Sequence, residues 1–221
     1  QFWKQFDWLQ FRKILRIGFP SGLQYFFEVG AFAGAVVMVG WLEDGSINRS
    51  AHQIAIQLAA IAYMLVAGLS AGAAIRVGEA YGRRDRLGVR LAGLAGIYLA
   101  IAMMIVTATV LIIGKDFFPA LFLSDSEVLS LAANLMVIAG LFQIFDGIQA
   151  VAIGILRGIQ DVKIPTIWAF VIYWLIALPL GYVFGFSWEG GLAGIWYSLV
   201  VSLGLASVVL TWRFWRLTQP G

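Results

Sequence analysis

The chain has 221 residues, of which 61% are hydrophobic and 12% charged, and its mean hydropathy is +0.88. A soluble globular domain is roughly 45–50% apolar and about 25% charged, so this composition excludes an ordinary water-soluble domain. The net charge of +3 does not indicate nucleic-acid binding, because the basic residues lie between apolar stretches. Since cysteine is absent, disulfides, thiolate metal sites and cysteine nucleophiles are excluded as well.

The first segment, residues 1–16, mixes aromatic side chains with basic ones. This pattern predicts an interfacial linker helix on the cytoplasmic leaflet, and a frayed aromatic linker is the alternative. The same charges interrupt any signal-peptide pattern, and the chain begins at Gln1 rather than at a methionine. We therefore expect an internal or C-terminal piece of a longer protein.

Six apolar stretches follow, each of about the twenty residues that a helix needs to cross a bilayer. Their approximate bounds are 17–42, 51–75, 91–113, 128–156, 165–186 and 191–212. The sequence thus predicts an all-α membrane protein, a bundle of six transmembrane helices. Residues 17–213 would form this lobe, and residues 214–221 a cytoplasmic tail.

The basic residues of the connecting segments predict the orientation of the bundle. Lys and Arg concentrate in cytoplasmic loops. All of them lie on one side of the predicted spans, except Arg49 and Lys115. Both termini are therefore expected in the cytoplasm, which agrees with an even number of crossings.

Two carboxylates, Glu28 and Asp146, lie well inside the predicted spans. Glu28 comes twelve residues after Arg16 and Asp146 eleven residues before Arg157, which places them ~18 Å and ~16 Å from the same face at the helical rise of about 1.5 Å. Tyr63 lies about 20 Å from that face by the same calculation. The sequence thus predicts one polar layer that crosses three helices near the middle of the bilayer.

Polar residues extend this layer along two of the helices. Gln24 precedes Glu28 by one turn, and Gln143 and Gln149 flank Asp146 at intervals of three. Such stripes are expected to face a protein interior or an aqueous cavity. No basic residue lies at this depth to neutralise the carboxylates, so the pair is suited to bind a proton or a small cation. Carboxyls that serve only as hydrogen-bond partners in helix packing are the alternative.

Three further residues attract attention without predicting chemistry. His52, at the outer end of the second span, is expected to have a capping or interfacial role. Pro20 and Pro179 are expected to kink the first and fifth spans.

The sequence contains no phosphate-binding loop, zinc-protease helix or nucleophile elbow. We therefore do not expect this protein to be an enzyme.

Several motifs follow one another along the chain: LRIGFPSGLQ (15–24), FEV (27–29), AHQIA (51–55), RVGEAYG (76–82), LRGIQD (156–161) and YWLIALPLG (173–181). In this order and spacing, they make the chain resemble the C-terminal six-helix lobe of multidrug and toxic compound extrusion (MATE) transporters. The resemblance implies a two-lobe, twelve-helix exporter in the bacterial inner membrane, a plasma membrane. By the same resemblance, this exporter is expected to exchange cationic or amphipathic compounds for sodium ions or protons.

The resemblance also implies roles for individual residues. Glu28 and Asp146 match carboxylates of the cation site in bacterial members, and Tyr63 matches a site tyrosine in some of them. Phe142 stands where some related proteins carry a tyrosine, which leaves the choice between sodium and proton open. Together with the three glutamines of the polar stripes it is a candidate for the substrate cavity.

The implied partners are a small-molecule drug or toxic cation, membrane lipid and an N-terminal six-helix lobe absent from this chain. No cofactor, bound metal or nucleic acid is expected. Two alternatives are a lipid or lipid-linked oligosaccharide flippase of the wider superfamily, which would favour basic cavity residues, and an intramembrane protease. A rhomboid-like protease would need a serine at the same depth as His52, and His52 lies too near the outer face to pair with the serines of the spans.

Overall fold

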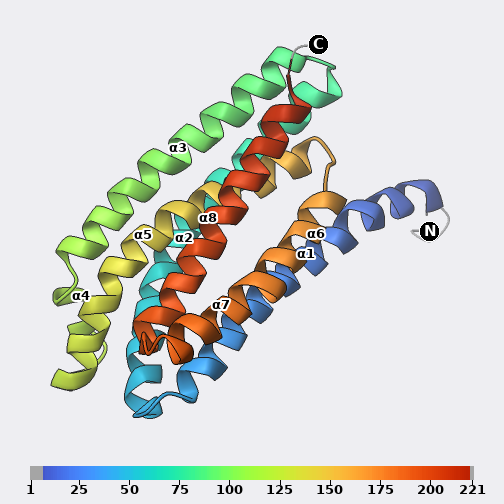
Figure 1. Cartoon of the computed structure of the whole chain (residues 1–221). Coiled ribbons are helices and arrows are strands. Elements are labelled where there is room, and N and C mark those ends of the chain that lie inside the picture. Colours follow the sequence, from blue (N-terminus) through green and yellow to red (C-terminus); the bar gives the residue numbers. More distant parts are fainter. Residues whose placement is uncertain (1–6, 220–221) are drawn as a thin grey trace, which may run out of the picture.

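The computed structural model describes residues 7–219, and this part of the chain consists of helices and turns. Six of its helical segments are long and apolar enough to cross a membrane, which confirms the predicted all-α bundle. The elements are α1 (Trp8–Gly40), α2 (Gly45–Gly82), α3 (Arg86–Ile113), α4 (Phe117–Ala120), α5 (Ser126–Gly158), α6 (Lys163–Phe170), η2 (Val171–Ala177), α7 (Leu178–Tyr182), η3 (Val183–Ser187) and α8 (Gly191–Leu217). Figure 1 shows the long helices running side by side in one bundle.

Aspartates begin three of the long helices. Asp7 accepts hydrogen bonds from two backbone amides of α1, Asp85 from one of α3 and Asp125 from two of α5. Such caps satisfy amides that have no partner inside the helix. Because α1 starts directly after Asp7, residues 8–16 are continuous with the first span. Their position on a membrane surface stays a prediction, and residues 1–6 and 220–221 of the predicted linker and tail lie outside the described residues.

The fifth span is one continuous helical segment of changing pitch. Two π-helical segments, η2 and η3, flank the short helix α7, at whose start Pro179 lies. A proline has no amide hydrogen and crowds the preceding turn, and a wider turn accommodates both effects. The change of pitch thus coincides with Pro179, while the kinks expected at Pro20 and Pro179 stay predictions.

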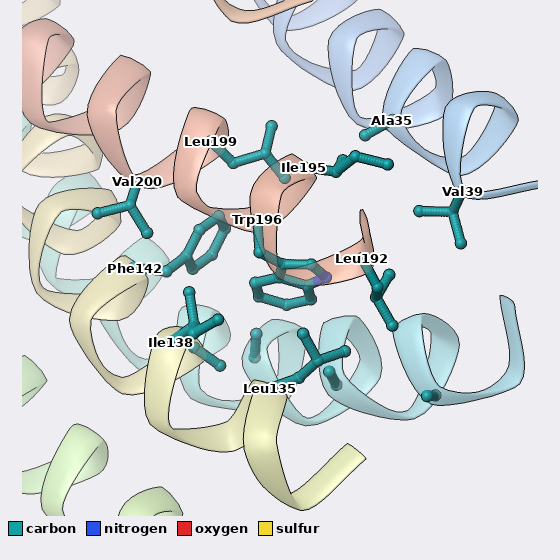
Figure 2. Close-up of a cluster of buried hydrophobic side chains, with 14 of the residues drawn as sticks. Ala35, Val39, Leu135, Ile138, Phe142, Leu192, Ile195, Trp196, Leu199 and Val200 are labelled. Carbon is teal, nitrogen blue, oxygen red and sulfur yellow. The ribbon is translucent and has the colours of Figure 1, made fainter. Parts of the chain in front are cut away.

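The core gathers around α5 and α8, the helices with the largest buried share. In Figure 2, Trp196 of α8 lies among side chains from α1, α2 and α5. It is fully buried, and its ring packs against Phe142 with centroids 5.6 Å apart. A second cluster, centred on Met104 and Ile155, joins α3 to α2, α5 and α8. Helix α5 thus holds the other spans in place around the polar layer.

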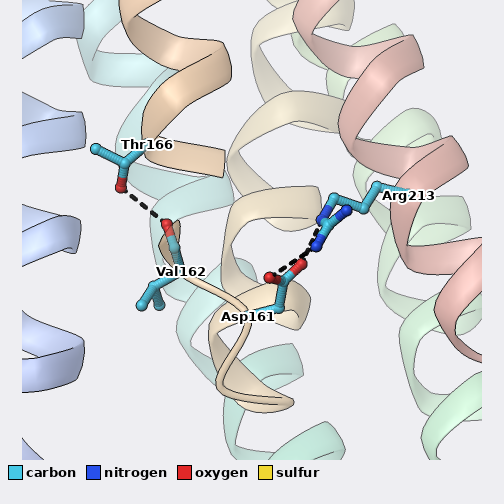
Figure 3. A network of polar contacts seen from close by, with 4 residues as sticks. All are labelled: Asp161, Val162, Thr166 and Arg213. Atoms are coloured by element: carbon cyan, nitrogen blue, oxygen red, sulfur yellow. Dashed lines mark hydrogen bonds and ion pairs between the residues drawn. The ribbon is translucent and has the colours of Figure 1, made fainter. Parts of the chain in front are cut away.

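Both ends of the described chain lie at the same end of the bundle, with the α2–α3 and α5–α6 turns (Figure 1). Arg213 of α8 holds the α5–α6 turn through two hydrogen bonds to Asp161, of 2.5 and 3.0 Å (Figure 3). Thr166, at the start of α6, donates to the carbonyl of Val162 and also lies 2.8 Å from that of Pro20 in α1. This end carries the basic loops, and we call it the basic end; its location in the cytoplasm stays a prediction.

Candidate functional site

The two carboxylates inside the spans lie on one cavity. Glu28 of α1, Asp146 of α5 and Tyr63 of α2 all line a cavity of about 260 Å³, which we call the carboxylate cavity. Asp146 is 6% exposed, whereas Glu28 and Tyr63 are half-buried. The fold therefore brings together the residues that the depth calculation selects. Their role in cation coupling stays a prediction.

Neither carboxylate has a basic partner within residues 7–219. The two ion pairs in this part of the chain are Arg76 with Glu79 and Arg213 with Asp161, and both lie at the basic end. A charged carboxylate inside a membrane is costly unless it is paired or reached by water. Among the described residues, neither carboxylate therefore has a positive charge that would neutralise it.

A short hydrogen-bond chain fixes one side of Glu28. The amide nitrogen Nε2 of Gln149 donates to Glu28 Oε1 at 3.2 Å. The hydroxyl of Tyr173, in η2, donates to Oε1 of the same glutamine at 2.6 Å. Because the tyrosine occupies the amide oxygen, the amide turns its N–H group toward the carboxylate. Gln149 is thus a buried support for Glu28 that connects α1, α5 and the fifth span.

The other candidates of the substrate cavity lie in three different places. Phe142 lines the carboxylate cavity and packs edge-on against Phe32 of α1, with ring centroids 5.9 Å apart. Gln24 lines a second cavity, on the basic-end side of Glu28. Gln143 is fully buried and donates to the carbonyl of Ala59 at 2.7 Å, so it links α5 to α2 and lines neither cavity.

The expectation for His52 is wrong. Its side chain is only 2% exposed, and its Nδ1 accepts a hydrogen bond of 3.1 Å from the indole of Trp196. It neither caps α2, which starts at Gly45, nor lies at an interface. The sequence position near the end of a span suggested exposure, but α8 covers this turn of α2.

Two further tyrosines, Tyr173 and Tyr25, belong to the site. Tyr173 orients Gln149, and Tyr25, one turn before Glu28, lines both cavities. The depth calculation would have found Tyr173, which follows Lys163 by ten residues, or about 15 Å of helix. No comparable signal marks Tyr25, which is 65% exposed.

The comparisons with known proteins agree with this architecture. The MatE family model matches residues 20–183. The chain is 37% identical to a probable multidrug resistance protein NorM of Rhizobium meliloti (strain 1021), over 99% of the chain and 47% of that protein. It is 38% identical to the protein of the same description in Brucella suis biovar 1 (strain 1330), over 98% and 46%. The chain thus spans about half the length of the curated relatives it matches.

Solved structures show the same fold. The eukaryotic MATE transporter AtDTX14 superposes with a TM-score of 0.85 at 22% identity, over 90% of this chain and 45% of that one. A MATE structure in the straight conformation gives a TM-score of 0.89 at 17% identity, over 97% and 48%. From the family model and the relatives above, the chain belongs to the MatE family, as its resemblance to multidrug and toxic compound extrusion transporters predicts.

Proposed function

We propose that this chain is one half of a secondary active multidrug exporter, which moves cationic or amphipathic compounds out of the cell in exchange for sodium ions or protons. The relatives described as probable multidrug resistance proteins support it. The observation that carries it is the pair Glu28 and Asp146, two carboxylates without a basic partner in residues 7–219, on one cavity among membrane-spanning helices. A bound cation or proton removes the cost of that arrangement.

The walls of the carboxylate cavity suit an amphipathic cation. Val29, Phe32 and Phe142 offer apolar surface to rings and alkyl groups, and the carboxylates offer a partner for the positive charge. The coupling ion needs the same carboxylates. Each ligand therefore weakens the binding of the other, and this effect is reciprocal by thermodynamic necessity. Such competition is the basis of exchange.

The working exporter contains, in this proposal, an N-terminal lobe of six further helices. The span of about half of each relative supports this. Two side chains on the rim of the carboxylate cavity, Tyr25 and Val29, are 65% and 45% exposed, as expected for a surface that another lobe faces. The protein would lie in the plasma membrane, the inner membrane of a bacterium, with both ends of this segment in the cytoplasm.

The two alternatives find less support. An intramembrane protease of the rhomboid-like serine type needs a histidine that activates a serine, and the Nδ1 atom of His52 is bound to Trp196 inside the core. A flippase for anionic head groups is expected to present basic residues in its cavity, whereas, among the described residues, the carboxylate cavity is lined by two acidic side chains and no basic one.

Substitution of Asp146 tests the proposal. Asp146→Asn keeps the shape of the side chain but offers a cation a dipole in place of a charge. In the complete protein that carries this sequence, we expect gradient-driven drug efflux to fall roughly tenfold or more, because a site with little ion affinity cannot couple two ligands. Glu28→Gln is expected to behave similarly. The matched control is Glu127→Gln, an exposed carboxylate in the first turn of the same helix.

The measurement is efflux against imposed sodium and pH gradients, varied separately, at matched expression. Wild-type efflux by the Asp146→Asn variant would show that the carboxyl is only a packing partner and would defeat the proposal.

A further inference from the structure

A second cavity borders Glu28 on the side that faces the basic end. It measures about 240 Å³, and we call it the inner cavity. One face of each of three helices lines it. These faces comprise Ser21, Gln24, Tyr25 and Glu28 of α1, Tyr63, Ala67, Ser70, Ala71 and Ala74 of α2, and Ala150, Ile153, Gly154 and Arg157 of α5. On α2, Ala67, Ala71 and Ala74 lead from Tyr63 toward Arg76, a basic residue in the last two turns of the same helix.

The two cavities differ in chemistry and share three side chains. Only Tyr25, Glu28 and Tyr63 line both. Beyond these three and Asp146, the carboxylate cavity is lined by apolar side chains alone. The inner cavity instead carries hydroxyl, amide and guanidinium groups between small alanines. Glu28 therefore lies at the boundary between an apolar and a polar space.

Gln24 indicates that the polar space holds water. Its side chain is 4% exposed, and its Nε2 atom has no hydrogen-bond partner among the described residues. A buried amide nitrogen without a partner costs about 1–3 kcal/mol. Water in the adjoining inner cavity can supply that partner, because Gln24 lines the cavity and a water needs only ~10–15 Å³ of such space. The inner cavity has room for several.

The hydroxyl groups of the inner cavity are arranged as acceptors. Ser21 donates its hydrogen to the carbonyl of Ile17 and Ser70 to that of Ala150. Their oxygen lone pairs stay available to water or to a cation. Arg157, exposed in the last turn of α5, stands at the far end of the lining. Its positive charge weakens cation binding at that end, so an ion is not retained there.

We infer that the inner cavity is a hydrated passage for the coupling cation, which connects Glu28 to the basic end, while the exported compound occupies the carboxylate cavity on the other side of Glu28. The inference rests on the proposed function, because it assigns separate spaces to the two ligands of that exchange. A chain of waters serves protons as well as sodium ions, so the passage fits either coupling ion.

Cysteine accessibility tests the passage directly. This chain contains no native cysteine that could react with a thiol reagent. Single cysteines introduced at Ala67 or Ala71 therefore report on the inner cavity alone within this chain. The control is Ala102→Cys, on the exposed surface of α3 and away from both cavities. The probe is a membrane-impermeant methanethiosulfonate, applied to either face of vesicles that contain the complete protein with its other cysteines replaced.

We expect Ala71→Cys to react from the face of the basic end at least about tenfold faster than Ala102→Cys, because a thiol in hydrocarbon forms little of the reactive thiolate. Ala67→Cys, one turn deeper, reacts from the same face and serves if the first variant does not insert. Rates equal to those of the control, or reaction from the opposite face only, would overturn the passage.

Gln24→Leu tests the role of the amide. We expect the half-saturating concentration of the coupling cation to rise roughly fivefold, the effect of one lost hydrogen bond, while the affinity for the drug, measured in the absence of the coupling cation, stays unchanged. Gln57→Leu, at an exposed position of α2 outside both cavities, is the control. An unchanged cation dependence for Gln24→Leu, or an equal shift in drug dependence, would contradict separate spaces.

The labelling experiment and the efflux experiment fail independently. Labelling measures whether water reaches the introduced thiols and from which face of the membrane, and it does not require transport. If the thiols react but Asp146→Asn exports normally, the proposed exchange falls and the cavity keeps its water without a coupling role. If Asp146→Asn is inactive but the thiols do not react, the exchange stands and the passage falls.

Discussion

Gly154 offers a test of how closely α5 approaches α2 beside the inner cavity. A Cβ atom at this glycine would lie 2.4 Å from the hydroxyl oxygen of Ser70 and 2.7 Å from its backbone oxygen. Neither atom moves freely. The hydroxyl donates to the carbonyl of Ala150 at 2.7 Å, and the backbone oxygen belongs to α2 itself. Gly154→Ala therefore forces the two helices apart.

The expected size of the effect follows from three contributions. Overpacking of this kind costs about 1–3 kcal/mol, and displacing the hydroxyl of Ser70 loses about 1 kcal/mol of hydrogen bonding. Alanine is better than glycine in a helix interior by about 1 kcal/mol, which offsets part of the loss. The free energy of unfolding should thus fall by about 1–3 kcal/mol. Gly72→Ala, where nothing lies within 4 Å of the added Cβ, is the matched control and should be neutral or slightly stabilising.

Thermal unfolding of the purified complete protein measures the difference. At roughly 2–4 °C per kcal/mol, a loss of about 1–3 kcal/mol should lower the melting temperature of Gly154→Ala by roughly 2–12 °C, whereas Gly72→Ala should melt at or slightly above the wild-type temperature. Adding Ser70→Ala should recover part of the loss, because it removes the hydroxyl but leaves the backbone oxygen. A Gly154→Ala protein that melts at or above the wild-type temperature would refute the reasoning about this contact.

Three further outcomes are expected. Trp196→Phe leaves Nδ1 of buried His52 without its donor and opens a small void, so the free energy of unfolding should fall by about 2–4 kcal/mol in the same melting experiment. Trp188→Phe, at an exposed position, is the control and should change little, and equal effects of the two substitutions would contradict the buried pair. A double-mutant cycle with Arg213→Met and Asp161→Asn should give a coupling free energy of about 1–2 kcal/mol in unfolding, since the ion pair is bidentate and largely shielded from water. Additive effects of the two substitutions would argue against a stabilising ion pair. Impermeant protease added outside intact right-side-out vesicles should not cut near either end of the segment, and cleavage there would reverse the predicted orientation.

The polar layer could be predicted because the depth of a residue in the membrane depends only on its position along the helix. A carboxylate inside an apolar span is conspicuous, and helical rise converts sequence distance into depth. Glu28, Asp146 and Tyr63 were selected in this way, and the fold places all three on one cavity. Tyr173 lies at a similar depth, but a tyrosine in a membrane helix is common and does not attract notice by itself.

Which neighbour each side chain faces around its helix axis is decided only by tertiary packing. Gln24, Gln143 and Gln149 look alike in the sequence, yet one lines the inner cavity, one bonds to α2 and one supports Glu28. The burial of His52 cannot be predicted from the sequence for the same reason, since it depends on how α8 covers α2.

Composition and hydropathy by themselves determined that this chain crosses a membrane as helices, because a bilayer leaves a polar backbone few other solutions. They also set the number of helices and the end at which the basic residues gather. What only the tertiary structure decided is the division of the space around Glu28 into an apolar and a polar cavity. That division depends on which helix faces meet, and contacts between residues far apart in the chain, such as Gly154 with Ser70, determine those faces.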